Sequence, residues 1–436
     1  MTERSTLVSK DRRHVWHPFT QEKTAPDPIP IARGEGPWLY GTDGRAYLDL
    51  ISSWWVNLHG HAHPAIANAI AEQATKLEQV IFAGFTHEPA VRLAERLAGH
   101  LPGNLNRVFY SDDGSTAVEV ALKLSIQYWR NREIPRHRIL AFEGGYHGDT
   151  VGAMSAGRGS GFFEAFSPLL FPVQRLPFPH TWHDDPDVRA KEDKALVALD
   201  KEIAQHGSQI AAMIVEPLVQ GAAGMRMCRP EFLQAVAERL HAAEILLIFD
   251  EVMTGFGRTG DWFACRKAGI TPDLICLSKG LTGGFLPLSV TVADDRIFDG
   301  FLADDFDHAF IHGHSFTANA LGCAAALASM DLLEQDDTWQ RISAIQSTHR
   351  EGLSLLTGHP RVERTRQTGT IAALDVSGGG RGYDATIGPK LKSECLKRGL
   401  LLRPLGNVLY LLPPYCLAAD ELRNAYDTIY ELLTGI

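Results

Sequence analysis

Two short apolar runs, each followed by one charged residue, constrain this chain more than any other feature. The run Leu-Leu-Ile-Phe leads directly to Asp250, and the run Leu-Ile-Cys-Leu-Ser leads directly to Lys279. Apolar runs of this length, bounded by turn residues, predict buried strands of a parallel sheet. Ligands of open α/β sheets bind just beyond the carboxyl ends of the strands. We therefore expect a carboxylate and an amine to project from neighbouring strand ends into one pocket.

An aspartate and a lysine placed in this way have two interpretations. Pyridoxal phosphate (PLP) enzymes use a lysine that forms a Schiff base with the cofactor aldehyde, and a carboxylate that contacts the pyridinium nitrogen. The other interpretation is a salt bridge with only a structural role. The pair alone does not separate them, so the flanking sequence has to decide.

The overall composition limits the kinds of partner. The 436 residues have a formal net charge of −10 and are 45% hydrophobic, which is ordinary for a globular protein. A negative net charge argues against nucleic acid or an anionic membrane as a partner. The six cysteines show no C-x-x-C spacing, a pattern typical of reduced cysteines in cytosolic proteins. There is no apolar signal region at the start and no run near the roughly 18 residues of a membrane span. We expect a cytoplasmic protein with small-molecule ligands.

Strand and helix patterns alternate through the middle of the chain. Strands are predicted at RVFYSD, RILAF, QIAAMIVE, EILLIFDE and LSVTVADD, and helices follow most of them. This alternation predicts an α/β fold with a large, mostly parallel sheet flanked by helices. Residues 157–207 read as a long irregular insertion followed by an amphipathic helix.

The two ends of the chain have a different character. Residues 1–60 are irregular, with a hairpin predicted about the turn TDG, and helices are predicted over 63–80 and 88–101. From about residue 330 the pattern becomes α+β, with helices near 386–398 and 418–434. We divide the chain into a segment 1–60 that joins the small domain and the active site, a large cofactor-binding domain 61–329, and a small C-terminal domain 330–436.

Polar and aromatic residues follow several of the predicted strands. The helix that starts at DGST offers free N–H groups to an anion, although Ser115 or Thr116 could simply be its N-cap. Tyr146 follows a strand and can stack on a flat cofactor. The adjacent Trp54 and Trp55 are either core filler or the wall of an apolar pocket.

Arg403 lies between apolar runs, where an unpaired guanidinium would be costly. It needs an anion, which is either an internal carboxylate or the carboxylate of a substrate. The alternating histidines His59, His61 and His63, and later His312 and His314, raise the question of a metal site. They lack the usual spacing and partners of zinc ligands, so we expect loop residues and no metal.

Six motifs in this chain, in order and spacing, resemble those of the class III, fold type I PLP-dependent aminotransferases. They are YSDDGSTAVEVALK, FEGGYHGDT, VEPLVQGAAGM, IFDEVMTGFGRTG, PDLICLSKGLTGG and HGHSFTANALGCAAA. Within the family, VWHPFTQ, SSWWVNLHGH and LRPLGNVLYLLPPY resemble the members that act in biotin biosynthesis. The resemblance implies amino transfer to 8-amino-7-oxononanoate by a homodimer with shared active sites.

The resemblance also assigns roles to residues. Lys279 is implied to bond covalently to PLP and to move a proton, and Asp250 to keep the pyridine nitrogen protonated. The implied cofactor-binding residues are Gly114, Ser115, Tyr146, Asp250, Val252, Lys279 and Ser315, the last from the partner subunit. The implied substrate-binding residues are Trp54, Trp55, Arg403 and Tyr410. The roles of Glu216 and Arg258 stay open.

Two departures from the family pattern concern the amino donor. Members that use S-adenosylmethionine usually have a tyrosine where this chain has Phe19, and the motif G-P-T-F is here G-H-S-F, with His314 and Ser315. The combination resembles members that take lysine as the amino donor. S-adenosylmethionine is the commoner donor in the family, so we slightly favour S-adenosylmethionine and keep lysine as the alternative. Two rival functions remain: a broad-specificity ω-aminotransferase, and a non-catalytic nucleotide-binding protein, although GLTGG lacks the G-x-G-x-x-G spacing.

Overall fold

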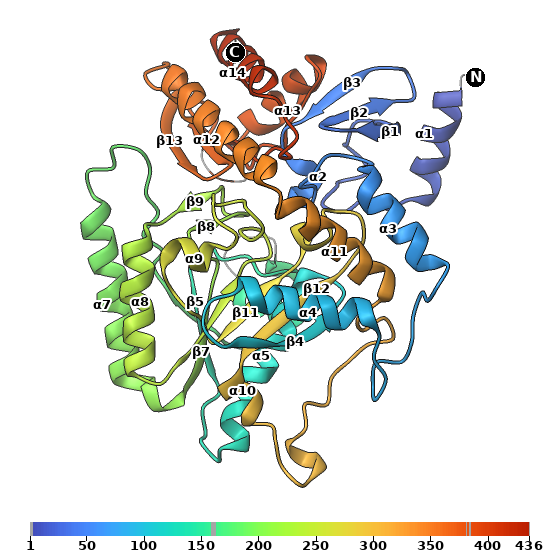
Figure 1. The fold of residues 1–436 in the computed structure, drawn as a ribbon. Helices are drawn as coiled ribbons and strands as arrows, with labels where there is room; N and C mark the ends of the chain where they lie inside the picture. Colours follow the sequence, from blue (N-terminus) through green and yellow to red (C-terminus); the bar gives the residue numbers. More distant parts are fainter. Residues whose placement is uncertain (1–2, 158–162, 381, 383–384, 436) are drawn as a thin grey trace.

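A seven-stranded sheet in the order β4-β12-β11-β10-β7-β5-β6 forms the centre of the molecule (Figure 1). The computed structural model describes residues 3–157, 163–380, 382 and 385–435. The strands are β4 (Leu105–Ser111), β5 (Arg138–Phe142), β6 (Gln174–Leu176), β7 (Ile210–Val215), β10 (Leu246–Asp250), β11 (Leu274–Leu277) and β12 (Ser289–Asp294). Only β12 runs antiparallel to its neighbours, β11 and β4. The predicted α/β fold is confirmed.

Both faces of the sheet are covered by helices, which explains why its strands are apolar throughout. Along β10, Leu247 and Phe249 belong to the core cluster that includes helices α4 and α8, whereas Leu246 and Ile248 belong to the cluster that includes α5. A strand buried on both faces shows no polar alternation. The large-domain helices are α3 (Pro64–Ala74), α4 (Glu88–His100), α5 (Gly114–Asn131), α6 (Val151–Gly157), α7 (Val188–His206), α8 (Pro230–Ala242), α9 (Ala264–Ala268), α10 (Asp295–Asp299) and α11 (Ala320–Leu333).

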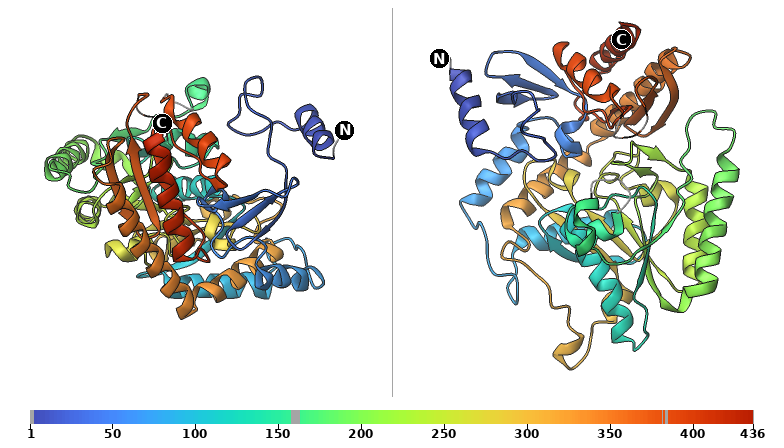
Figure 2. Two further views of the ribbon diagram at one scale, coloured as in Figure 1. Left: turned by 90° about the horizontal axis from the view of Figure 1, so that it is seen from above. Right: turned by 180° about the vertical axis from the view of Figure 1, so that it is seen from behind.

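The two ends of the chain meet in a second, mixed sheet above the large domain. Its order is β1-β2-β3-β15, and β15 (Leu400–Leu401) pairs in parallel with β3 (Ala46–Asp49). The predicted hairpin is present, because β2 (Trp38–Gly41) pairs antiparallel with β3, and β1 (Ile31–Glu35) lies outside β2. The first helix, α1 (Glu3–His14), stands away from the body of the molecule (Figure 2). A short, irregular helix, α2 (Ser52–Trp55), follows β3 in the chain.

The C-terminal part has its own sheet and helices. The sheet order is β13-β14-β16, with β13 (Val362–Thr368), β14 (Ile371–Val376) and β16 (Val408–Leu411). The helices α12 (Asp336–Leu356), α13 (Ile387–Lys397) and α14 (Ala419–Gly435) pack with it. Short elements elsewhere are η1 (Glu164–Leu169), η2 (Gly207–Gln209), β8 (Val219–Gln220), β9 (Arg226–Met227), η3 (Lys279–Thr282) and η4 (Phe306–His308). The domain boundaries at 60 and 330 stay predictions.

Two predicted elements differ from the structure. The helix expected over 63–80 ends at Ala74, and the chain then leaves as a loop. The insertion expected to be irregular contains β6, the edge strand of the central sheet. A strand of three residues is too short to show a recognisable hydrophobic pattern in the sequence. Its pairing with β5 identifies it as a strand. In the described part of the chain, no helix is long and apolar enough to span a membrane.

Candidate active site

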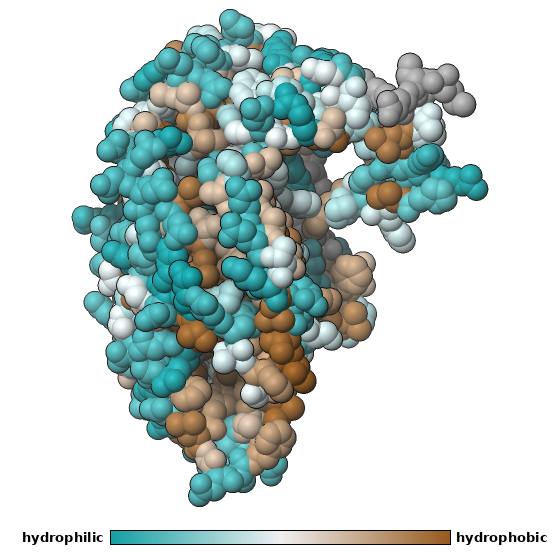
Figure 3. Space-filling model, turned by 45° about the vertical axis from the view of Figure 1, so that its right-hand side comes forward, coloured by the Kyte–Doolittle hydropathy of each residue, from teal (hydrophilic) through white to brown (hydrophobic). Residues whose placement is uncertain are grey.

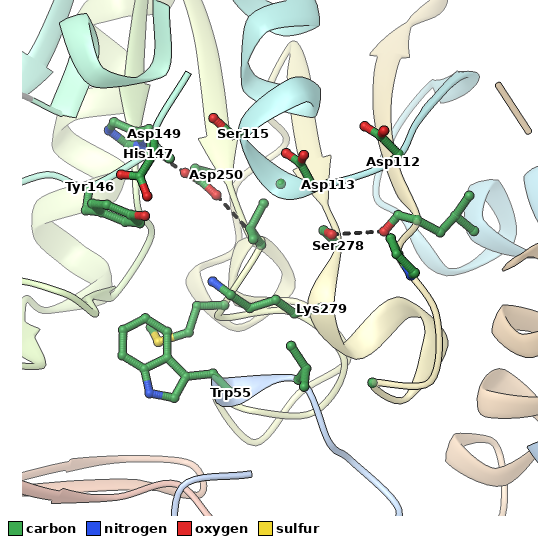
Figure 4. Close-up of a pocket in the computed structure, with 18 of the residues that line it drawn as sticks. Trp55, Asp112, Asp113, Ser115, Tyr146, His147, Asp149, Asp250, Ser278 and Lys279 are labelled. Atoms are coloured by element: carbon green, nitrogen blue, oxygen red, sulfur yellow. Dashed lines mark hydrogen bonds and ion pairs between the residues drawn. The ribbon is translucent and has the colours of Figure 1, made fainter. Parts of the chain in front are cut away.

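The ends of β10 and β11 bring Asp250 and Lys279 to the same cavity. The two strands are parallel neighbours, and Asp250 lies opposite Cys276 in their register. Lys279 follows two residues after β11 ends and has a φ of 46°, a left-handed backbone conformation that is unusual outside glycine. Both residues line a cavity of about 710 Å³ (Figure 4). The prediction that the two side chains share one pocket is confirmed.

Asp250 is held in a fixed orientation at the base of this cavity. Its Oδ2 shares a hydrogen bond of 2.7 Å with Nδ1 of His147, and its Oδ1 accepts one of 3.1 Å from the backbone N–H of Val252. Burial opposes protonation of His147, but the hydrogen bond and charge of Asp250 outweigh it, so the pKa of His147 is raised. The two hydrogen bonds together fix the direction in which the Asp250 carboxylate points.

Lys279 is half-buried, and charged side chains surround its amine. Burial lowers the pKa of Lys279, while the charges of Asp250 and Glu216 act in the opposite direction. Its Nζ lies 5.0 Å from the centre of the Trp55 ring. A lowered pKa increases the unprotonated fraction of an amine, which is the form that attacks an aldehyde.

The first turn of α5 forms another wall of the cavity. The N-cap is Asp113, which accepts a hydrogen bond of 2.9 Å from the N–H of Thr116, so the suggestion that Ser115 or Thr116 caps this helix is wrong. Gly114 lies against Val252: a Cβ at position 114 would come within 2.5 Å of Val252 Cγ1. The capping carboxylate leaves the hydroxyl of Ser115 free for other partners.

A network of hydrogen bonds supports Ser115 from behind. Its Oγ accepts from the N–H of Thr150 at 2.9 Å and shares a second hydrogen bond of 2.7 Å with Thr150 Oγ1. Thr150 Oγ1 in turn donates to Glu119 at 2.5 Å, and the same carboxylate oxygen accepts from the N–H groups of Gly152 and Ala153. The loop after β5 is thereby fixed to the helix N-terminus, a position that favours anions.

Tyr146 and Glu216 close the side of the cavity next to Asp250. Glu216 accepts hydrogen bonds of 2.9 Å from the N–H groups of Tyr146 and Gly221. Burial raises the pKa of Glu216 to about 7. Glu216, whose role the sequence left open, therefore fixes the loop that presents the Tyr146 ring.

The outer wall comes from the two ends of the chain. Trp55 is buried and donates from its Nε1 to the Tyr410 hydroxyl at 2.9 Å, whereas Trp54 is 38% exposed. The guanidinium carbon of Arg403 lies 4.4 Å from the Trp54 ring centre and 5.9 Å from that of Phe19. Trp55 thus lines the 710 Å³ cavity, whereas Trp54 and Tyr410 are not among its lining residues.

Arg403 lies outside the inner cavity and beside a neighbouring one of about 750 Å³, which Phe19 also lines. Among the described residues, the structure records no ion pair between Arg403 and a carboxylate. Arg403 therefore makes cation–π contacts instead of an internal salt bridge. These contacts leave the charge of its guanidinium available to an anionic ligand.

Two residues singled out by the sequence lie elsewhere. Ser315 is exposed and does not line the 710 Å³ cavity of its own chain. Arg258 is fully buried and donates to the carbonyl oxygens of Pro413 and Asn57, both at 2.9 Å. Arg258 therefore ties the N-terminal segment to the C-terminal one and does not line the cavity.

The histidines that raised the question of a metal have protein partners. His59 shares a hydrogen bond with Ser329, His61 with Asp49, and His63 accepts from the N–H of Ala65. Burial lowers the pKa of His59 to about 3. No group of three or more possible metal ligands occurs among the residues that the structure describes.

Sequence reasoning did not select all residues that build this site. His147, Asp149 and Thr150 line the cavity, and Glu119 supports it, yet none was predicted. The first three belong to the motif GYHGDT, which marked the loop but not its polar contacts. Glu119 gave no signal, because an acidic residue in a helix is usually exposed.

The architecture and the cavity can now be compared with known proteins. Residues 19–433 match the family described as aminotransferase class-III. The chain belongs to this family and is an aminotransferase.

Individual relatives cover nearly the whole chain. The adenosylmethionine-8-amino-7-oxononanoate aminotransferase of Synechococcus elongatus is 59% identical over 97% of this chain and 99% of its own. A crystal structure of the enzyme of the same name from Methanocaldococcus jannaschii has a TM-score of 0.92 at 33% identity, covering 99% of both chains. An amine transaminase from an uncultivated Pseudomonas species, solved in a PLP-bound form, has a TM-score of 0.88 at 32% identity, covering 96% of this chain and 98% of its own.

Proposed function

We propose that this aminotransferase converts 8-amino-7-oxononanoate to 7,8-diaminononanoate, the amino-transfer step of biotin biosynthesis. The observation that carries the proposal is the joining of two features in one site. Lys279 and Asp250 share the inner cavity with Trp55, and Trp54, the residue before it in the chain, contacts Arg403. The 59% identical relative from Synechococcus elongatus bears the name of this activity.

The cofactor in this proposal is PLP, and the residues present fit it. A buried carboxylate, a half-buried amine and a helix N-terminus with a hydroxyl surround one cavity, matching a ring nitrogen, an aldehyde and a phosphate. When bound, PLP supplies an electron sink for the carbon that gains or loses the amino group. Lys279 would hold its aldehyde carbon, Asp250 its ring nitrogen, and Gly114 and Ser115 its phosphate. Tyr146 and Val252 would lie against the ring.

The chain's own groups carry out the proton movements. The unprotonated Nζ of Lys279 would take the proton from the reacting carbon of the substrate and would later return a proton. Its lowered pKa favours this role. Asp250, held in place by its hydrogen bond with His147, would hold a proton on the ring nitrogen of the bound cofactor. The buried setting strengthens these charge interactions.

The outer wall selects an oxo acid with an apolar chain. Trp54, Trp55 and Tyr410 provide apolar faces that exclude water from the aliphatic part of the substrate. Arg403 would bind the carboxylate at the far end of the chain, and its guanidinium suits this group through paired hydrogen bonds. A substrate that lacks the carboxylate would lose this contact.

The amino donor in this proposal is S-adenosylmethionine, with lysine as the alternative. Phe19 contacts Trp54 edge to face at a centroid distance of 5.5 Å and offers no hydroxyl to a donor. The test is a half-reaction: the holoenzyme is mixed with either donor, and conversion of PLP to its amine form is followed by absorbance. The donor that brings about the conversion at the lower concentration is the one assigned.

We also propose a homodimer in which Ser315 serves the phosphate site of the partner subunit. Segments near 79 and 316 lie side by side, because Gln79 Nε2 donates to the carbonyl oxygens of Ser315 and Thr317. Large apolar side chains in and near these segments are exposed: Ile81, Phe85, Phe306, Ile311 and Phe316. Exposed apolar side chains also gather on the lower part of the face in Figure 3. A single chain rarely leaves such a surface uncovered, and sedimentation as an active monomer would refute the dimer.

The decisive test of the reaction uses 8-amino-7-oxononanoate with both candidate donors. Formation of 7,8-diaminononanoate supports the proposal, and no product with either donor removes it. The second candidate is an ω-aminotransferase of broad specificity, favoured by the likeness to the amine transaminase. It predicts comparable turnover of simple amines that lack a carboxylate.

A further inference from the structure

A second large cavity lies at the junction between the large domain and the C-terminal domain. It has a volume of about 790 Å³ and shares no lining residue with the cavity that contains Asp250 and Lys279. Its walls come from α9, the segment after β9, the C-terminal half of α12, and β13 (Figure 1). The proposed transamination uses none of these residues.

The lining of this junction cavity is basic. Arg229, Lys267, Arg350 and Arg366 line it, and none of its lining residues is an aspartate or a glutamate. Arg366 is fully engaged, because it donates to Asp375 and to the carbonyl oxygens at 224 and 225. The remaining three cations have donors to spare, so they decide what the cavity can bind.

Arg350 is the most available of these cations. It is exposed on α12, and the structure records neither a hydrogen bond nor an ion pair from its guanidinium to any described residue. Arg229 uses its Nε and Nη2 on Glu192, and no hydrogen bond from its Nη1 is recorded among the described residues. Both arginines line a cavity whose lining contains no carboxylate.

Lys267 adds a partly buried ammonium to the cavity. Its Nζ donates to the carbonyl of Thr259 at 2.6 Å and to the Thr368 hydroxyl at 2.9 Å, both neutral acceptors. Burial lowers the pKa of Lys267, and the charge of Asp261 opposes this effect only in part. An anion in the cavity would offset this unfavourable burial of charge.

The floor of the cavity is apolar. Leu218, Met227 and Leu353 line it and are 2%, 5% and 7% exposed, respectively. Amide and hydroxyl groups of Gln346, Ser354 and Thr357 complete the walls. An apolar floor with a cationic rim matches a ligand that has an apolar body and one anionic head.

We propose that the junction cavity is a second binding site, for an organic anion with a short aliphatic body and a carboxylate or phosphate head. Arg350 and Lys267 bind the head, and Leu218, Met227 and Leu353 receive the body. Because the walls belong to two parts of the chain, the bound ligand contacts both α12 and the large domain.

The test locates the ligand directly on the PLP-loaded enzyme. Octanoate that carries a photoreactive diazirine is bound and photolysed, and the labelled peptides are mapped by mass spectrometry. We expect label in residues 181–183, 346–357 or 365–369, and competition by unlabelled octanoate but not by neutral octanamide. Octyl phosphate is a second competitor, which shows whether the site prefers a phosphate or a carboxylate head.

Variants of α12 separate a specific site from non-specific binding. Arg350→Gln should weaken labelling of the junction peptides about tenfold, since it removes a charge-assisted hydrogen bond. Arg350→Glu should weaken it further. Arg341→Gln is the matched control, because Arg341 lies on the same helix, outside the cavity, and pairs with Asp337. Absence of label from the junction peptides, equal competition by octanamide, or unchanged labelling in both Arg350 variants would overturn the proposal.

Discussion

The two walls of the active site are built in different ways. Most of the inner wall consists of residues at strand ends and a helix start in the middle of the chain, such as Asp250, Lys279 and Ser115. Trp55, from the N-terminal segment, also lines the inner cavity. The outer wall brings together residues from opposite ends of the chain: the hydrogen bond between Trp55 and Tyr410 spans 355 positions. The inner wall is held by buried hydrogen bonds on every side, whereas Arg403 in the outer wall touches mainly aromatic faces.

This difference separates chemistry from selection. In the proposed function, the inner wall contains the acid, the amine and the anion site that carry out the amino transfer. The outer wall contains the groups that meet the variable part of a substrate. Changes in the inner wall should therefore reduce turnover with every substrate, and changes in the outer wall should discriminate between substrates.

The largest effect is expected for Lys279→Ala. This variant loses both the bond to the cofactor and the group that moves the proton, so turnover should fall by about 10⁴-fold or more. Turnover and the absorbance of bound cofactor are measured together, with circular dichroism as the control for folding. Activity within tenfold of the wild type would contradict the role of this lysine.

Asp250→Asn should have the next largest effect. The amide is neutral and cannot hold the proton on the ring nitrogen, so turnover should fall by on the order of 10²- to 10³-fold with every amino donor. Retention of PLP is the control, because the rest of the cavity is unchanged. A loss confined to one substrate would place Asp250 in the selecting wall instead.

Binding of PLP by the cofactor-free enzyme should accelerate as the pH rises. The pKa of Lys279 is lowered from the ordinary 10.5, so the unprotonated amine accumulates at a lower pH than in a free lysine. Below this pKa the rate should increase about tenfold per pH unit, and it should level off before pH 10.5. The rate of the absorbance change at several pH values measures this, and a plateau only above pH 10.5 would disprove it.

Arg403→Ala should discriminate between the two half-reactions. Loss of the charge-assisted contact should raise KM for the oxo acid about tenfold to a hundredfold, with a smaller effect on a donor that does not use this residue. Arg398→Ala is the matched control, since Arg398 is paired with Glu394 on the surface. Equal effects on both substrates would indicate a structural arginine.

The smallest effect is expected for Tyr410→Phe. The variant removes the acceptor of the Trp55 N–H and leaves the ring in place, at a cost of about 1 kcal/mol. We expect kcat/KM for the oxo acid to fall about fivefold, while PLP binding is unchanged. An equal loss with a small amine substrate would remove the proposed distinction between the walls.

The central sheet could be predicted because its strands are buried on both faces. A continuous apolar run such as 246–249 is recognisable as a buried strand from the sequence alone, and the charged residue that follows the run marks the site. The edge strand β6 has only three residues and was missed, since its identity depends on pairing with Phe142 and its neighbours.

The contacts within the site were less accessible to sequence reasoning. Nothing in the residues around His147 shows that its ring binds Asp250, which lies 103 positions away. The aromatic contacts of Arg403 could not be predicted either, because the sequence suggested only an internal carboxylate or the carboxylate of a substrate as its partner. Local patterns predict elements, whereas such contacts depend on how the elements pack.

The pairing of β3 with β15 has a consequence for how the protein is made. The N-terminal strands leave the ribosome first, but their partner at Leu400–Leu401 is synthesised near the end of the chain. The edge of β3 that pairs with β15 therefore remains unpaired while about 350 further residues are synthesised. Unpaired strand edges promote aggregation. A chain released before residue 400 would contain every residue of the inner wall and still lack a closed substrate pocket.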